Sequence, residues 1–216
     1  MSFRKFSIYI AFLSFFILTL TGCSSSTDSS SSSSSSSSST TTEKTTFKKS
    51  INSSTPVVWF YAVGTNIHDI TENELPTIGK DSEIDGAFVN QKGNSHFYTF
   101  TDKLGYNNIT LKNFKNLTGQ KLVDKVKKLA TTERVQGNKL KVHITTDETG
   151  NNTKSEKISY AFGNDTNLSN PLTLSNSAVQ GNVYNNLYLG FKLSGFTPNM
   201  LITPVTGEKA TVELDK

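Results

Sequence analysis

A run of serine and threonine near the N-terminus divides this chain and limits where it can fold. Residues 24–42 are almost entirely Ser and Thr, including eleven consecutive serines from Ser29 to Ser39. Such a segment has too little apolar surface to offset the conformational entropy that is lost on ordering. We therefore expect a disordered tether over residues 23–56 and one globular domain over residues 57–216.

The segment before the serines has the pattern of a secretory signal. Arg4 and Lys5 are followed by fifteen uncharged residues, from Phe6 to Leu20. This run is shorter than the about 20 apolar residues that cross the hydrocarbon core of a bilayer. A positive flank, a short apolar core and small residues before a cleavage point are typical of a signal peptide. Cleavage at another position and an uncleaved membrane anchor are the alternatives.

The end of the apolar core carries a more specific motif. Leu20-Thr21-Gly22-Cys23 resembles the lipobox of bacterial lipoproteins, and Cys23 is the only cysteine of the chain. The resemblance implies that residues 1–22 are the signal peptide, that the lipoprotein signal peptidase cuts between Gly22 and Cys23, and that a diacylglycerol is attached to the Cys23 sulfur. It also implies a lipid-anchored protein on the extracytoplasmic face of the cell membrane, because two or three acyl chains hold a protein stably.

Charge argues against a nucleic-acid partner. Residues 57–216 contain 17 Lys and Arg against 16 Asp and Glu, so the folded domain is nearly neutral. A nucleic-acid-binding domain is expected to carry a basic excess of its own. Within the domain the charges are segregated, with six acids and one lysine between Asp69 and Asp85 and eleven bases against three acids between Gly86 and Thr146. Solvated faces explain this most simply, and a basic patch for an anionic surface is the alternative.

Short apolar and alternating runs after Pro56 predict a mostly β domain. Residues 57–63 form a β-branched and aromatic run that ends at a glycine, which indicates a buried strand. Alternating or apolar segments predict further strands, with hairpin turns between neighbours. We expect strands at 84–90, 95–101, 108–115 (a weaker one), 139–147, 154–162, 186–193, 199–205 and 210–215.

One segment has helical periodicity. Leu122, Val126 and Leu129 recur at helical spacing, and Thr118 is a suitable N-cap, so an amphipathic helix is expected over about 118–132. Lys121, Lys125 and Lys128 fall on the opposite face of that helix. They are the candidate residues for contact with an anionic surface, with ordinary solvated surface as the alternative.

Strands, one helix and then more strands predict an α+β domain, mostly antiparallel, as a small barrel-like sheet or a two-layer sheet. Its many aromatic residues would fill the core or line a cavity. The Ser/Thr tether and the aromatic first strand loosely resemble small surface lipoproteins of Gram-positive bacteria, especially lactic-acid bacteria. That resemblance is one of layout, and such proteins mostly have no assigned function.

One segment resembles part of a metal-binding pattern. Asp81, Glu83 and Asp85, followed by Gly86, have the spacing of the first ligands of a calcium loop. The last ligand position of such a loop is Lys92, a cation where a bidentate glutamate is needed. The three histidines are isolated, and His143 alternates out of phase with apolar neighbours, which places it toward solvent. The sequence thus predicts no catalytic residue and no cofactor.

These features together predict a non-catalytic binding or interaction module held at the membrane through the lipid on Cys23. Its ligand would be an envelope polymer, a small molecule or a partner protein. An envelope-directed hydrolase and a purely structural surface protein are the alternatives.

Overall fold

The structure is a computed structural model of the whole chain, and the residues it describes belong to one compact unit. The described residues are 44–65, 74–100, 107–135, 140–160, 169–194, 198–206 and 210–216. The predicted signal peptide (residues 1–22), Cys23 and the serine run lie outside these ranges.

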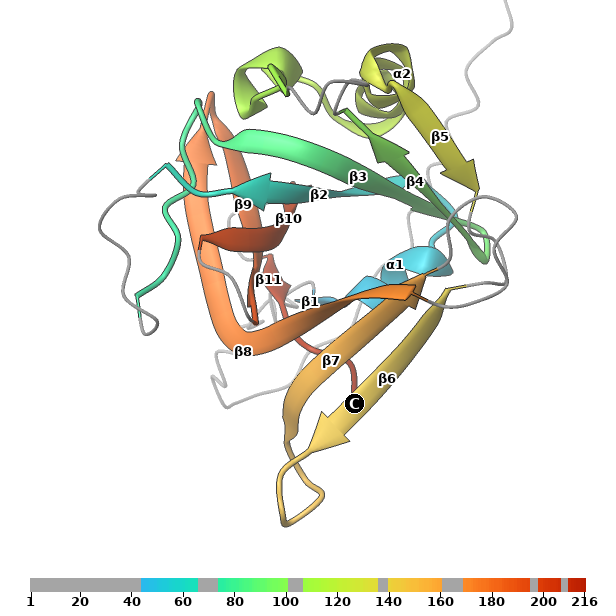
Figure 1. Cartoon of the computed structure of the whole chain (residues 1–216), viewed down its shortest axis with the longest axis vertical. Helices are drawn as coiled ribbons and strands as arrows, with labels where there is room; N and C mark the ends of the chain where they lie inside the picture. The colour runs from blue at the N-terminus through green and yellow to red at the C-terminus, as the bar shows by residue number, and fades with distance from the viewer. Residues whose placement is uncertain are drawn as a thin grey trace, which may run out of the picture. The chain divides into compact units, whose positions relative to one another are not determined.

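A nine-stranded antiparallel sheet forms most of the domain (Figure 1). Its strand order is β5-β4-β3-β2-β10-β9-β8-β7-β6. The strands are β2 (Val57–Val63), β3 (Glu83–Gln91), β4 (Asn94–Thr99), β5 (Thr132–Val135), β6 (Lys141–Thr146), β7 (Thr153–Tyr160), β8 (Ser169–Val183), β9 (Asn186–Leu193) and β10 (Asn199–Val205). The α+β class with a mostly antiparallel sheet is confirmed.

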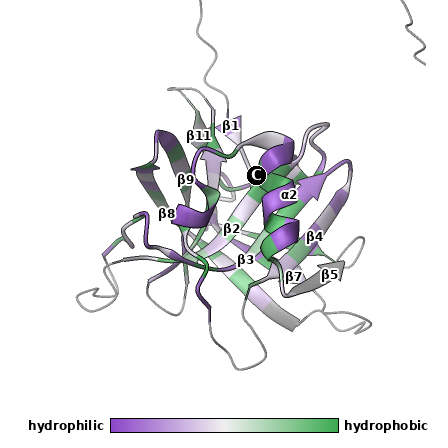
Figure 2. Ribbon diagram, turned by 90° about the horizontal axis from the view of Figure 1, so that it is seen from above, coloured by the Kyte–Doolittle hydropathy of each residue, from purple (hydrophilic) through white to green (hydrophobic). Residues whose placement is uncertain are grey.

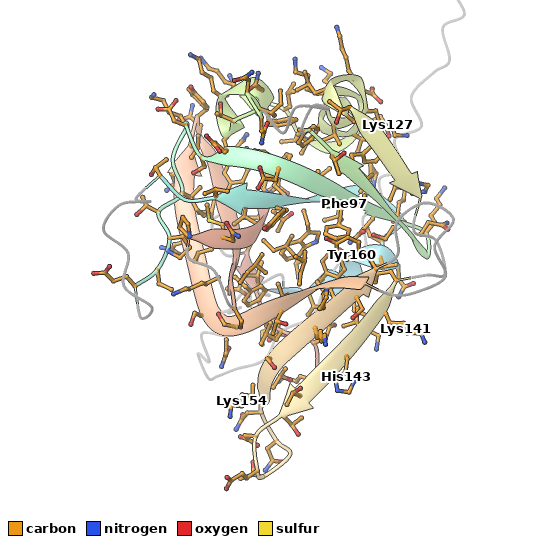
Figure 3. The ribbon with its side chains drawn as sticks, viewed as in Figure 1. Phe97, Lys127, Lys141, His143, Lys154 and Tyr160 are labelled. Carbon is orange, nitrogen blue, oxygen red and sulfur yellow. The ribbon has the colours of Figure 1, made fainter. Side chains whose placement is uncertain are left out.

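The sheet curls into a half-barrel, so that strands far apart in the strand order face one another. Tyr160 on β7 lies 5.4 Å from the ring of Phe88 on β3 and 5.3 Å from the ring of Phe97 on β4, measured between ring centroids. Figure 3 shows Phe97 and Tyr160 pointing toward each other across the inside of the curl. Aromatic residues expected to fill the core or line a cavity are therefore core residues here.

One face of the sheet is covered by α2 (Gly119–Leu129) and the short 3-10 helix η1 (Leu111–Phe114). Leu122, Val123 and Val126 of α2 are buried against the face of β2 that carries Phe60. In Figure 2, α2 lies in front of the strands when the molecule is seen from above. The expected helix is confirmed, but it ends at Leu129, because Ala130 takes an extended conformation and β5 begins at Thr132.

The inner face of the curl is covered by a helix that the sequence prediction assigned to the tether. Helix α1 (Phe47–Ile51) follows strand β1 (Lys44–Thr45), which pairs in parallel with β11 (Thr211–Val212). The Phe47 side chain is fully buried, with its ring 5.3 Å from that of Phe88. The expected boundary at residue 57 is therefore wrong. The described domain begins by Lys44, because Phe47 fills the curl of the sheet.

Two further expectations differ from the structure. The weak strand at 108–115 is η1 instead, since the Asn113 side chain accepts a hydrogen bond from the Thr110 backbone amide and closes a turn. The longest strand, β8, was not predicted. None of the helices in the described ranges is long and apolar enough to cross a membrane.

Candidate functional site

A cleft of about 770 Å³ opens between α1, the start of α2 and the end of β10. The segment that joins α1 to β2 forms its remaining wall. It is lined by Thr45, Lys49, Ser50, Asn52, Ser53, Ser54, Thr55, Pro56, Val57, Val58, Thr118, Gly119, Leu122, Thr203, Pro204, Val205, Thr206 and Ala210. Its volume lies within the range of about 300–1,000 Å³ that is typical of small-molecule sites.

The lining of the cleft combines hydroxyl and amide groups with aliphatic side chains. Serine, threonine and asparagine residues come from α1, the segment after it, the N-cap of α2 and β10, while valine, proline and leucine are the apolar residues of the lining. Two of the polar residues, Ser50 and Thr203, are buried. Lys49 is the one ionisable residue of the lining, and its Nζ donates a hydrogen bond to the Lys44 carbonyl at 2.7 Å. The lining contains no carboxylate. With one cation and no carboxylate, such walls suit a polar ligand that carries no positive charge.

Ser50 connects the cleft wall to the core. Its hydroxyl accepts hydrogen bonds from the Trp59 indole at 3.0 Å and from the Asn90 amide at 2.8 Å. It also donates to the Phe47 carbonyl at 2.5 Å. Trp59 is the only tryptophan of the chain and is fully buried. Buried polar groups that are all satisfied in this way hold a unique arrangement, so α1 forms a fixed wall.

Asp215 forms hydrogen bonds with the first turn of α1. Asp215 accepts hydrogen bonds from the Thr46 hydroxyl at 2.5 Å and from the Lys48 backbone amide at 3.0 Å. Thr46 is the N-cap of α1, and its hydroxyl oxygen accepts a bond from the Lys49 amide. A carboxylate is favoured at a helix N-terminus, where backbone amides have no partner within the helix. We call Thr46, Lys48, Glu156 and Asp215 the terminal latch.

Glu156 is the fourth member of the terminal latch, and it is fully buried on β7. Its Oε2 accepts the Asp215 backbone amide at 3.0 Å, whereas Oε1 has no partner. Burial raises the pKa of Glu156 from its ordinary value of 4.5 to about 7, and the neighbouring Asp215 carboxylate also raises it. Neither acid lines the cleft. Both are therefore used to hold α1 rather than to contact a ligand there.

The predicted lysine residues lie on the surface of α2. Lys121 and Lys128 are exposed and Lys125 is half-buried, while Leu122 and Val126 face the sheet. Lys127, which was not among the predicted residues, is also exposed on this helix. Figure 3 shows Lys127 pointing away from the molecule.

The predicted calcium residues are not brought together. The exposed Asp81 forms an ion pair with Lys80, and Asp85 accepts a hydrogen bond from the Asn107 amide at 3.0 Å. Glu83 is exposed at the start of β3. Over the described residues, no three acids, histidines or cysteines form a group suited to a metal ion. His143 is exposed on β6, as predicted from its phase.

Other predicted site residues, Gly22 and Cys23, lie outside the described residues. The cleft and the terminal latch were not predicted from sequence, because the residues of α1 were assigned to the tether. Two signals were present: an aromatic residue, Phe47, after the threonines, and Glu156 in phase with the apolar positions Ile158 and Tyr160.

The cleft and the terminal latch are therefore interpreted from their own geometry. Comparisons of this chain with protein-family models, with curated proteins and with solved structures found no match.

Proposed function

We propose that this protein is a lipid-anchored binding module on the extracytoplasmic face of the cell membrane. In this proposal Cys23 carries the lipid, the serine run is the tether, and the cleft beside α1 holds the ligand. The partners are thus the membrane, through the lipid on Cys23, and an uncharged ligand that bears hydroxyl and amide groups.

The observation that carries the binding role is the composition of the cleft walls. Asn52, Ser54 and Thr55 after α1, together with Thr118 and Thr206, are exposed residues of one cleft that also has valine, proline and leucine in its lining. Small-molecule sites commonly join a few placed polar groups to apolar walls. N-acetylated sugars and short peptides present the same combination of hydroxyl, amide and methyl groups. An envelope glycan or peptide is therefore the class of ligand that we propose for this cleft.

The geometry favours binding over hydrolysis. A glycosidase of the common kind needs two carboxyl groups on either side of the bond that is cleaved. The two buried acids near α1 instead form hydrogen bonds within the terminal latch, and the cleft lining supplies no acid. The proposal accordingly assigns no catalytic residue and no cofactor to the cleft.

The test is a titration followed by amide and indole NMR signals. The probes are a chain of N-acetylglucosamine units and a short uncharged peptide. We expect shifts of the Trp59 indole signal, because its acceptor Ser50 lines the cleft, and of backbone amides in α1 and at the start of α2.

Two variants make the titration specific. Thr118→Arg and Thr206→Arg place a bulky charged side chain at exposed positions of the lining. We expect the double variant to lose the shifts. Thr145→Arg, at an exposed position of β6 that does not line the cleft, is the matched control and should keep them. No shift with either probe, or equal shifts in the double variant, would contradict the binding role of this cleft.

A further inference from the structure

The outward side of α2 carries four lysines, Lys121, Lys125, Lys127 and Lys128, which we call the lysine face. The helix buries Leu122, Val123 and Val126 on its other side. The one acid of the helix, Asp124, accepts a hydrogen bond from the Gln120 side chain at 2.9 Å. Four cations against one anion leave a net charge of three on a single helical surface.

The lysine face takes no part in the ion pairs of the fold. The salt bridges among the described residues join Lys44 to Glu213 and Lys80 to Asp81. Three of the four lysines of the face are exposed, and Lys125 is half-buried. Their positive charge is thus presented to solvent.

The position of α2 links the lysine face to the proposed anchor. Thr118 and Gly119 at the start of α2 line the same cleft as Thr45, one residue after the point where the described chain begins. The tether predicted from sequence leaves 20 residues between Cys23 and Lys44, and a coil of that length would span about 25 Å on average. A domain held at the bilayer by such a tether can bring α2 into contact with the headgroups.

The chemistry of the lysine face fits a surface of phosphate charges rather than a pocket for one phosphate. Lysine is a flexible point charge, whereas recognition of a single phosphate commonly uses the planar fork of arginine. Among the described residues, the large exposed hydrophobic side chain is Leu75, which precedes β3 and is not on α2. Contact would therefore be electrostatic and at headgroup level, without insertion into the hydrocarbon.

We propose that the lysine face of α2 docks onto anionic phospholipid headgroups of the membrane to which the chain is tethered. This inference rests on the proposed membrane anchor. Docking would fix the orientation of the domain, and with it the direction in which the cleft faces.

The test measures how close the domain comes to the bilayer. The full protein, purified from the membrane fraction, is reconstituted into phosphatidylcholine vesicles with or without phosphatidylglycerol, each containing a dansyl-labelled lipid. Energy transfer from Trp59, the only tryptophan, reports the approach of the domain. We expect more transfer on the anionic vesicles, and loss of the difference when salt shortens the Debye length from about 10 Å at 0.1 M to about 3 Å at 1 M.

Two variants that lose the same net charge at different places separate the effect of the lysine face from the effect of net charge. K121Q/K127Q/K128Q removes three exposed lysines of α2, and K141Q/K154Q/K157Q removes three exposed lysines of β6 and β7. Figure 3 shows Lys127 at the opposite end of the molecule from Lys154. Each lysine near an anionic surface favours binding about fivefold. We expect the α2 variant to lower the ratio of docked to undocked protein by about two orders of magnitude, and the control variant to leave it nearly unchanged.

Equal transfer on neutral and anionic vesicles, or equal loss in both variants, would overturn the inference. Failure of the anchor gives a different result, because an unanchored protein would not attach to neutral vesicles. If that protein bound anionic vesicles through the lysine face, the attraction of this face to anionic headgroups would stand, whereas the anchor and docking to a membrane that carries it would not.

Discussion

At the scale of single residues, Glu156 and Asp215 lie next to each other but have unequal sets of partners. Asp215 accepts hydrogen bonds from Thr46 and Lys48, whereas Oε1 of the buried Glu156 has no partner. An ionised carboxylate in such a place is costly, so the protonated form of Glu156 is favoured and its pKa rises to about 7.

This pKa predicts how the stability of the domain depends on pH. Between pH 4.5 and about 7 the folded chain binds more protons at Glu156 than the unfolded chain does. The free energy of unfolding therefore falls as the pH rises through this window, by about 1–3 kcal/mol from this residue. Glu156→Gln removes the titrating group but keeps an acceptor for the Asp215 amide.

Urea unfolding of both proteins at several pH values checks the prediction. Other carboxyl groups contribute equally to both, so the difference between the two curves isolates Glu156. We expect the Gln variant to gain stability relative to the original as the pH rises from 4.5 to 7, and a constant difference above that. Parallel curves across the whole range would show that Glu156 does not titrate as proposed.

Residue-level prediction from sequence worked where one local pattern decides the outcome. His143 points to solvent because strand alternation puts it opposite Val142 and Ile144. Trp59 is buried because its strand is apolar on both faces. The terminal latch could not be derived, since its contact joins Thr46 to Asp215 across 169 positions of sequence, and no local pattern reports such a distance.

At the scale of elements, strands with a clear apolar or alternating pattern were predicted well. Strands β2, β9 and β10 have the expected bounds, because each lies in the middle of the sheet and buries both faces or nearly so. The hairpin of β3 and β4 turns at Lys92 and Gly93, both with positive φ, as a tight two-residue turn requires.

Strand β8 was not predicted because its composition does not favour a strand. Its 15 residues contain Pro171, Gly181 and several Ser and Asn, which disfavour strands when read alone. Pairing with β7 on one side and β9 on the other overrides that preference, and the register shifts between Leu174 and Ala178. Figure 1 shows β8 bending around the curl of the sheet.

Removal of helix α1 is expected to lower the stability of the domain. A chain of residues 40–216 keeps β1 and α1, whereas a chain of residues 57–216 follows the boundary expected from sequence. The shorter chain loses Phe47, whose burial is worth about 2–3 kcal/mol, and both donors to Asp215. We expect its melting temperature to be lower by about 10 °C or more.

Calorimetry of the two chains under the same conditions gives this comparison. The shorter chain should also bind more of a dye that fluoresces on exposed apolar surface. The reason is that Trp59 and Phe88 lose their contact with the Phe47 ring. Equal melting temperatures would show that α1 is an appendage and that the domain begins at residue 57.

At the scale of the whole molecule, the cleft, the lysine face and the start of the described domain lie together. Thr45 and Thr118 line one cleft, so the first residues of the described domain lie near the helix that carries the lysines. The fold class and the helix followed from sequence periodicity. The cleft did not, because its walls come from segments separated by up to 165 residues of chain, from Thr45 to Ala210.

The proposed anchor depends on the state of Cys23, and it would place the cleft and the lysine face at a membrane. The most direct measurement is the intact mass of the protein recovered from the membrane fraction, with fragmentation of its N-terminus. We expect a chain that begins at Cys23 and carries a diacylglycerol on the sulfur, and we expect Cys23→Ala to abolish that modification. A free Cys23 thiol on protein released into the medium, or residues 1–22 still attached, would contradict the account.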